Sequence, residues 1–270
     1  MKGRLNFLIG AALLLVILVM ALTATVWTPF DPLALDLRAR FLPPGGAHLL
    51  GTDEFGRDVL SRLMSGATQS LTVAAFTVGF ATLFGTLLGL FSGYVGGTLD
   101  RILMVISDAV LAFPGTLLAL ALLVVMGPNV YGIVLALGIA YTPSMLRIVR
   151  GTVMSLRERE FIEASHVIGN SEWATMLRHV LPNCIAPITV LATSMFGWVI
   201  LAESGLSFLG LGVPPPQPTW GNMLSTARDH IDRAVWLGIF PGLCISATLL
   251  GVILLGDGLR DRFDPRTENT

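Results

Sequence analysis

The chain has 270 residues, of which 53% are hydrophobic and only 13% are charged, whereas an average soluble domain carries about 25% charged residues. Its formal net charge is −1, so no global field draws nucleic acid or anionic lipid to it. This composition excludes an ordinary soluble domain and favours a helical protein that crosses a membrane several times.

The first apolar stretch covers residues 6–30 and follows Lys2 and Arg4. It is longer than the roughly 7 to 15 residues of a secretory signal core, so we expect it to be kept as a span. Long apolar stretches predict six spans in all, over 7–28, 71–94, 102–126, 130–149, 183–203 and 235–256. A turn signal at Gly127 separates the third span from the fourth. The expected fold is therefore all-α and polytopic.

We expect three parts, namely a first span with an outer segment over 1–66, a transmembrane core over 67–257 and a short tail over 258–270. Within the first part, residues 51–66 predict a short helix on the membrane interface, capped by Thr52 or Asp53.

Eleven of the 17 Lys and Arg residues fall on the side that holds both termini, and six fall on the other side. This bias predicts that both termini lie in the cytoplasm. The long connection over 150–182 then lies inside.

The second predicted span carries small residues at intervals of four, which form one face of a helix: Ala81, Gly85, Gly89, Gly93 and Gly97. Such a face lets another helix approach closely, because helix association in lipid depends on packing. Packing within this chain and packing against a partner subunit both remain open.

Two short helices are predicted in the connection over 150–182. The first has Phe161, Ala164, Ser165 and Ile168 at helical spacing and is expected to end at Gly169. Asn170 or Ser171 is expected to cap the second helix, and Pro182 to end it. A DNA-binding helix pair is disfavoured, because residues 151–182 hold three arginines against four acidic residues. A docking element for a cytoplasmic protein is the better interpretation.

The same connection resembles the cytoplasmic motif of permease subunits of bacterial ABC importers, written E-A-A, three residues, G, nine residues, I-x-L-P. The motif positions are matched by Glu163, Ala164, Gly169, Leu181 and Pro182, whereas Ser165 replaces the second alanine and His179 the isoleucine. Four other stretches resemble the dipeptide, oligopeptide and nickel branch of this family: GTDEFGRDVLSRL from Gly51, DAVLAFPGTLLAL from Asp108, ESGLSFLGLGVPPPQPTWGNML from Glu203 and GDGLRDRFDP from Gly256.

This resemblance implies a type I ABC importer permease in the bacterial inner membrane. It implies a second related permease, two ATP-binding cassette subunits on the cytoplasmic side that bind ATP and Mg²⁺, and a periplasmic or lipid-anchored solute-binding protein. It also implies that Glu163, Ala164, Ser165, Gly169, Leu181 and Pro182 couple the chain to the ATPase. The solute stays open among dipeptides, longer peptides, glutathione, opines and nickel chelates.

No catalytic chemistry is expected in this chain itself. Its only lysine is Lys2, so it lacks the lysine of a phosphate-binding loop, and we expect no cofactor. The predicted topology also separates His48 and His230 from His166 and His179, so no metal site is expected.

Two acidic residues fall within predicted spans, Asp108 and Glu203. A charge at the centre of a span costs roughly 2.5 to 3.5 kcal/mol on insertion scales, so each is expected to face protein or water. Each could line the path of the solute or take part in pairing within the membrane. The rival function is a secondary transporter or channel in which these two residues bind coupling ions.

Overall fold

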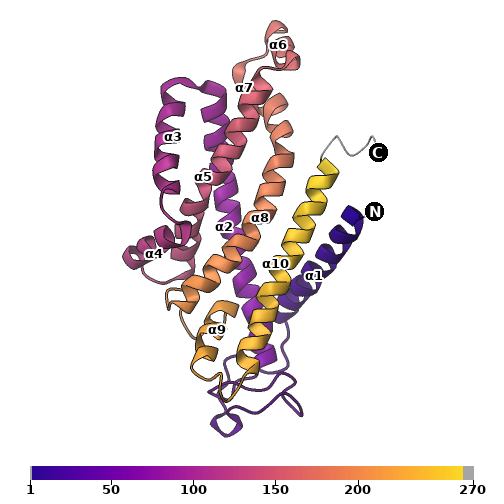
Figure 1. The fold of residues 1–270 in the computed structure, drawn as a ribbon, viewed down its shortest axis with the longest axis vertical. Coiled ribbons are helices and arrows are strands. Elements are labelled where there is room, and N and C mark those ends of the chain that lie inside the picture. The colour runs from indigo at the N-terminus through magenta and orange to yellow at the C-terminus, as the bar shows by residue number, and fades with distance from the viewer. Residues whose placement is uncertain (1, 264–270) are drawn as a thin grey trace.

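The computed structural model describes residues 2–263, and every regular element in this part of the chain is helical. The principal helices run roughly along one long axis, as Figure 1 shows. Their bounds are α1 Lys2–Ala24, α2 Val59–Val95, α3 Gly97–Leu111, α4 Gly115–Met126, α5 Val130–Arg157, α6 Glu160–Val167, α7 Glu172–Thr175, α8 Leu181–Phe208, α9 Trp220–Arg228 and α10 Trp236–Phe263. A short 3₁₀ turn, η1, covers Leu37–Ala39, and a π-helical stretch, η2, covers Met176–Val180.

Within residues 2–263, five continuous helical stretches are long and apolar enough to cross a membrane, and a sixth crossing requires the bent pair of α3 and α4. The sequence predicted one helix over 102–126, and this prediction was wrong. The two helices meet at an angle of 90°. Pro114 precedes α4 and causes the break, because proline has no N–H to donate and disfavours helical backbone at the residue before it.

The helix α2 covers Val59–Val95, so it begins before the predicted second span over 71–94 and ends close to its predicted end. Its N-cap is Asp58, whose carboxylate accepts a hydrogen bond from the Ser61 N–H at 2.8 Å. The expected interfacial helix over 51–66 capped by Thr52 or Asp53 is therefore wrong, because Asp53 instead holds a turn by accepting the N–H groups of Phe55 and Arg57, each at 2.9 Å. Since α2 is continuous across residue 66, the division between the first two expected parts falls inside a helix.

The small-residue face of α2 packs against α5 of the same chain. A Cβ atom at Gly85 would lie 2.5 Å from the Met145 Cβ, and one at Gly93 would lie 2.8 Å from the Val153 Cβ. Glycine is thus required for the two backbones to approach this closely. Gly97 does not belong to this face, because it lies beyond the end of α2, has a φ of +65° and has open space around it.

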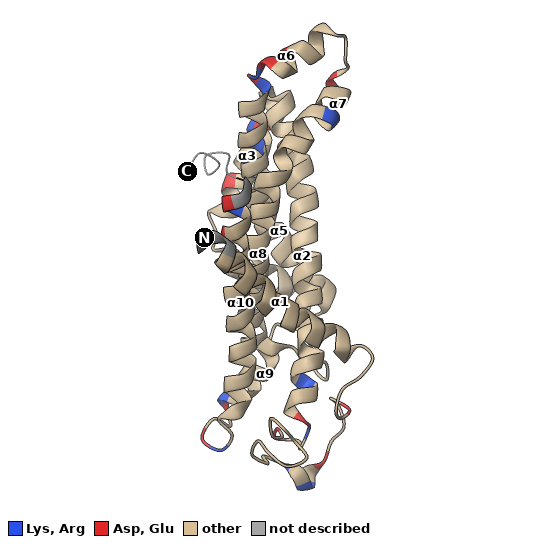
Figure 2. Ribbon diagram, turned by 90° about the vertical axis from the view of Figure 1, so that its right-hand side faces the viewer, with Lys and Arg blue, Asp and Glu red and all other residues tan. Residues whose placement is uncertain are grey.

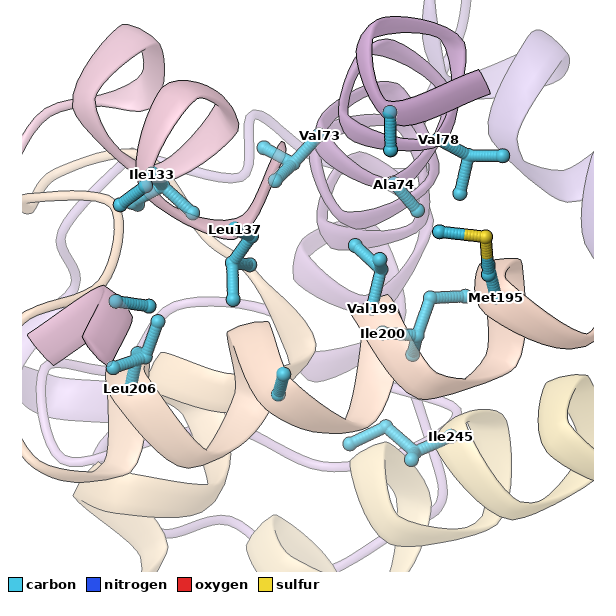
Figure 3. Close-up of a cluster of buried hydrophobic side chains, with 14 of the residues drawn as sticks. Val73, Ala74, Val78, Ile133, Leu137, Met195, Val199, Ile200, Leu206 and Ile245 are labelled. Carbon is cyan, nitrogen blue, oxygen red and sulfur yellow. The ribbon is translucent and has the colours of Figure 1, made fainter. Parts of the chain in front are cut away.

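The core lies where α2, α5, α8 and α10 meet, and Figure 3 shows part of it. The labelled side chains are Val73, Ala74 and Val78 of α2, Ile133 and Leu137 of α5, Met195, Val199, Ile200 and Leu206 of α8 and Ile245 of α10. On the flank of this core α1 crosses α10 closely, because a Cβ at Gly10 would meet the Gly251 carbonyl oxygen at 2.7 Å.

The two ends of the bundle differ in character. One end carries α6 and α7, and the N-terminal end of α1 and the C-terminal end of α10 point toward it, as Figure 1 shows. The opposite end carries α9 and the long segment between α1 and α2. Figure 2 shows charged residues gathered toward these two ends, with a middle zone that is almost free of them. This distribution suits a bundle that spans a membrane.

Candidate functional site

The first candidate site is the hairpin of α6 and α7, which projects from one end of the bundle (Figure 2). Gly169 connects the two helices with a φ of +88°, the left-handed conformation expected there. Ser171 caps α7 by accepting the Ala174 N–H at 3.3 Å, which decides between the two predicted caps. The other candidate, Asn170, turns back toward α6.

A buried polar bridge ties α6 to α7. The hydroxyl groups of Ser165 and Thr175 lie 2.9 Å apart, and the Asn170 amide donates to the Ser165 Oγ at 3.0 Å. Ser165 is 4% exposed and Thr175 is fully buried, so water does not compete for these bonds. The serine that departs from the family motif therefore has a specific structural role. No residue pattern indicated the two partners of Ser165, namely Thr175 and Asn170.

The outer surface of the hairpin is apolar. Phe161, Val167 and Ile168 are 43%, 86% and 80% exposed, whereas only Ile162 and Ser165 of α6 are buried. The residues predicted at helical spacing do lie on or at the end of a helix, and of these four, Phe161, Ala164 and Ile168 are exposed while Ser165 is buried. The reason is that α6 has only the short α7 beside it, which cannot cover a full helical stripe. Glu163 is exposed on the same helix.

The hairpin continues directly into the membrane. Residues Glu172–Phe208 form one helical stretch of 37 residues, so the prediction that Pro182 ends a helix was wrong. In the π-helical stretch just before it, the Leu181 N–H donates to the Met176 carbonyl, and this wider turn accommodates the proline ring. The Asn183 side chain donates to the His179 carbonyl at 2.6 Å. Leu181 is half-buried, while Pro182 is exposed.

Two ion pairs connect α3 to α5 near the same end of the bundle. Asp108 pairs with Arg147, and both side chains are largely exposed. Asp100 accepts a hydrogen bond from the Arg150 Nη2 at 2.7 Å and also accepts from the Ser92 hydroxyl. The pairing of Asp108 with an arginine is thus observed, but the more buried pair at Asp100 was missed, since it lies just outside the predicted span.

Glu203 lies in a different environment from Asp108. It is 1% exposed, and its Oε1 accepts a hydrogen bond from the Ser207 hydroxyl at 2.7 Å. It forms no ion pair with any described residue. Close by, a Cβ at Gly221 of α9 would lie 2.7 Å from the Ser204 Cα. Glu203 therefore lies at the tight contact of α8 with α9.

An apolar groove of about 440 Å³ opens between α4, α5 and α8. Its lining residues are Thr116, Leu117, Leu120, Tyr141, Trp198, Leu201, Ala202, Gly205, Leu206 and Leu209. The rings of Tyr141 and Trp198 stack with centroids 6.5 Å apart. Its volume falls within the range of roughly 300 to 1,000 Å³ of small-molecule sites. No sequence motif marked these residues, because they come from three helices distant in the chain.

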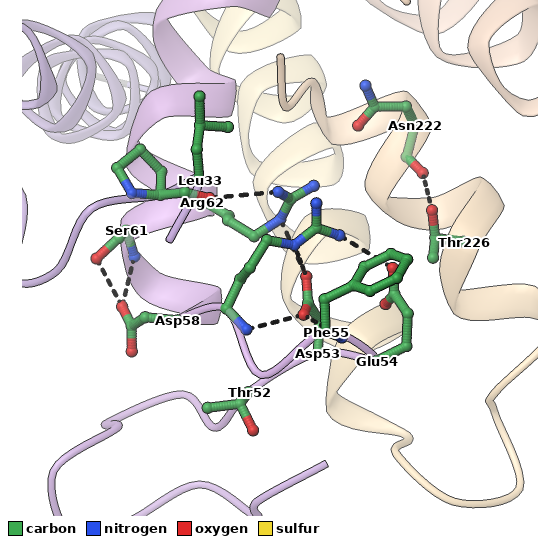
Figure 4. A network of polar contacts seen from close by, with 12 residues as sticks. Leu33, Thr52, Asp53, Glu54, Phe55, Asp58, Ser61, Arg62, Asn222 and Thr226 are labelled. Carbon is green, nitrogen blue, oxygen red and sulfur yellow. Dashed lines mark hydrogen bonds and ion pairs between the residues drawn. The ribbon is translucent and has the colours of Figure 1, made fainter. Parts of the chain in front are cut away.

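A polar network fixes the opposite end of the bundle, as Figure 4 shows. Arg57 binds Asp53 at 2.6 Å and Glu54 at 2.9 Å, and Arg62 lies 3.4 Å from Asp53. All four side chains are at least 88% buried, so the network stabilises the fold of the GTDEFGRDVLSRL stretch. Among residues 2–263, no group of three or more His, Cys, Asp or Glu side chains is placed to hold a metal ion.

Comparison with known proteins gives a consistent result. Residues 85–269 match the family described as "Binding-protein-dependent transport system inner membrane component". A putative peptide transport system permease protein of Brucella suis is 41% identical over 263 residues, which cover 97% of this chain and 88% of that protein. The dipeptide transport system permease protein DppC of Alkalihalophilus pseudofirmus is 40% identical, with 97% and 86% covered. The glutathione transport system permease protein GsiD of Pectobacterium atrosepticum is also 40% identical, with 84% and 75% covered.

Proposed function

Because this chain belongs to the family of binding-protein-dependent transport system inner membrane components, we propose that it forms one half of the pore of an ATP-driven importer. The chain is a multi-pass inner-membrane permease subunit with the type I ABC permease fold. Two ATP-binding cassette subunits hydrolyse ATP with Mg²⁺, a second related permease completes the pore, and an outer binding protein delivers the solute.

The α6/α7 hairpin is the observation that carries this proposal. Its tip exposes Phe161, Val167 and Ile168 outside the membrane-spanning bundle, where apolar side chains have no lipid to contact. An exposed apolar patch with polar neighbours is typical of a protein interaction surface. Glu163 lies on the same short helix and adds a charge that an ATPase groove can recognise. We therefore place the ATPase contact on α6.

The orientation follows from the same assignment. If the hairpin contacts ATPases, its end of the bundle is cytoplasmic, and so are the ends of α1 and α10 that point the same way (Figure 1). The larger share of Lys and Arg on this side supports the same orientation. The polar network around Asp53 then faces the periplasm and is available, through its exposed neighbours, to the binding protein.

We propose that the solute is a short peptide or a comparable small compound. The relatives carry names that refer to peptides, dipeptides and glutathione. The groove between α4, α5 and α8 supports a path for such solutes, because it is wide enough and its stacked rings, Tyr141 and Trp198, offer apolar contact.

The secondary-transporter alternative receives less support. A coupling-ion site needs oxygen ligands that are free to bind the ion, but the Asp108 carboxylate already pairs with Arg147. Glu203 is buried against α9 and is not among the residues that line the groove. The two acidic residues also lie on different helices with different surroundings, and no described cluster joins them.

Purification in mild detergent followed by reconstitution into liposomes tests the proposal. We expect the chain to co-purify with a second permease and two ATPases, and the liposomes to take up a peptide only when ATP and the binding protein are present. Glu163→Arg is expected to reduce uptake while membrane insertion stays normal, and Glu158→Arg, a charge reversal at the end of α5 just before α6, serves as the matched control. Uptake driven by an ion gradient without ATP would refute the proposal.

A further inference from the structure

The end of α2 nearest the hairpin contacts α7 through two aromatic rings. The Phe91 and Trp173 ring centroids are 5.5 Å apart and the planes are inclined by 82°, an edge-to-face arrangement. This geometry is one of the two that aromatic pairs prefer, because the positive ring edge meets the negative face of its partner. Along the chain, the two residues are separated by the whole of α3, α4, α5 and α6.

The next turn of α2 adds contacts on the same side. The Arg157 guanidinium, from the end of α5, lies 5.9 Å from the Tyr94 ring centroid and donates to the Gly93 carbonyl at 3.3 Å. Glu172 and Thr175 of α7 lie beside Tyr94. The ends of α2, α5 and α7 thus meet at one place, where Phe91 and Trp173 form the aromatic contact between α2 and the hairpin.

The hairpin has few other attachments. α6 is joined to α7 by the Ser165 bridge, and the hairpin is joined to the bundle by the chain at its two ends. A displacement of α6 therefore passes to α7. From there it can follow the helix into α8, across the π-helical stretch η2, or it can cross to α2 through the rings.

We propose that the Phe91–Trp173 pair is the joint through which movement of the α6/α7 hairpin reaches α2, and that Trp173 is a positioning residue for transport. This inference rests on the proposed function, which takes α6 as the ATPase contact. Because Gly85, Gly89 and Gly93 hold α2 against α5, a force applied to α2 moves both helices. Without the joint, among the residues that the structure describes, only the contacts of Tyr94 with Glu172 and Thr175 connect the hairpin to α2, and less of the hairpin's movement reaches α2.

Spin labels on the full chain in liposomes test the joint without any transport. The labels are placed by Val95→Cys and Val167→Cys, two exposed positions at the end of α2 and the tip of the hairpin, after replacement of both native cysteines. We expect a narrow distance distribution that Trp173→Ala broadens and Trp173→Phe restores. Phe76→Ala, which removes a ring from an exposed position of the same helix α2, is expected to leave it unchanged.

Uptake and ATP hydrolysis by the assembled complex give the second readout. Trp173→Ala is expected to keep ATP hydrolysis but to lower the solute transported per ATP about tenfold, the ratio that 1.4 kcal/mol represents. Phe91→Ala should have the same effect, and the double variant should be no worse than either single one, because both remove the same contact. If Trp173→Ala does not assemble, Phe91→Leu keeps the apolar volume and tests the ring alone.

An unchanged distance distribution in Trp173→Ala would overturn the joint, and so would additive losses of coupling in the double variant. If the proposed function itself is wrong, the result is different: the complex without substitutions shows no ATP-dependent uptake. The spin-label distances would still report on the joint in that case.

Discussion

Replacement of Gly89 by alanine is the most direct test of how α2 and α5 pack. The added Cβ would lie 2.7 Å from the Leu146 carbonyl oxygen, 2.8 Å from the Val149 Cβ and 3.1 Å from the Arg150 nitrogen. Two of these atoms belong to the α5 backbone, so the collision cannot be relieved by turning a side chain. Overpacking of this kind costs about 1–3 kcal/mol, more than the roughly 0.5–1 kcal/mol that alanine gains over glycine in a helix.

Gly79→Ala is the matched control, because Gly79 lies on the same helix and its Cβ would meet nothing within 4 Å. We expect Gly79→Ala to be neutral or slightly stabilising, Gly89→Ala to lower the midpoint of thermal unfolding, and Gly89→Leu to lower the yield further. The measurement is the fraction of monodisperse protein after heating in detergent, read by size-exclusion chromatography. Equal midpoints for Gly79→Ala and Gly89→Ala would show that the helices separate at no cost, which would refute the reasoning.

Three further predictions concern orientation, the hairpin and the groove. In a background without native cysteines, Leu49→Cys should react in intact cells with an impermeant thiol reagent and Val167→Cys should not; labelling of the second would reverse the proposed orientation. Ser165→Ala should destabilise the hairpin by about 1–3 kcal/mol, because the buried Thr175 hydroxyl and the Asn170 amide lose their shared partner. The measurement is proteolysis of the hairpin, which should be faster in Ser165→Ala than in a variant that replaces an exposed serine by alanine. Trp198→Cys in the assembled complex should react with a water-soluble reagent and be protected by peptide; reaction only with an apolar reagent would mean that lipid fills the groove.

The helical type of the membrane segments, and five of the six predicted spans, could be predicted from the sequence, because length and hydropathy largely decide whether a helix can cross a bilayer. The separation of α4 from α5 was also predicted correctly: Gly127 adopts a φ of +79°, and Asn129 caps α5 by accepting the Gly132 N–H at 2.8 Å. These features are local, so they depend on residue types that are adjacent in the chain.

The failures arise where the outcome depends on contacts between distant residues. Pro114 was read as part of a span and proved to break it, whereas Pro182 was read as a helix end and proved to lie within one. The same residue type gives opposite results because the second proline follows a π-helical turn that makes room for its ring. That turn cannot be seen in the residue pattern.

In the candidate site, too, local features could be predicted from the sequence and contacts between distant residues could not. Gly169 could be placed from the motif, since its left-handed backbone strongly favours glycine. The partners Thr175, Phe91 and Tyr141 could not be placed, because each is defined by a neighbour across the fold. Glu203 was expected either on the solute path or in intramembrane pairing, but it contacts Ser207 and lies at the packed junction of α8 and α9.

That junction links the two ends of the bundle. The helix that begins in the hairpin at Glu172 continues to Phe208, where it packs against α9. In turn, α9 is fixed to α2, because the buried Trp220 donates from its indole Nε1 to the Leu63 carbonyl at 3.1 Å and from its backbone N–H to the Ser70 hydroxyl at 3.3 Å. Through the rings at one end and Trp220 at the other, α2 and α8 are therefore joined twice. These two connections, near opposite ends of α2, oppose sliding of one helix past the other.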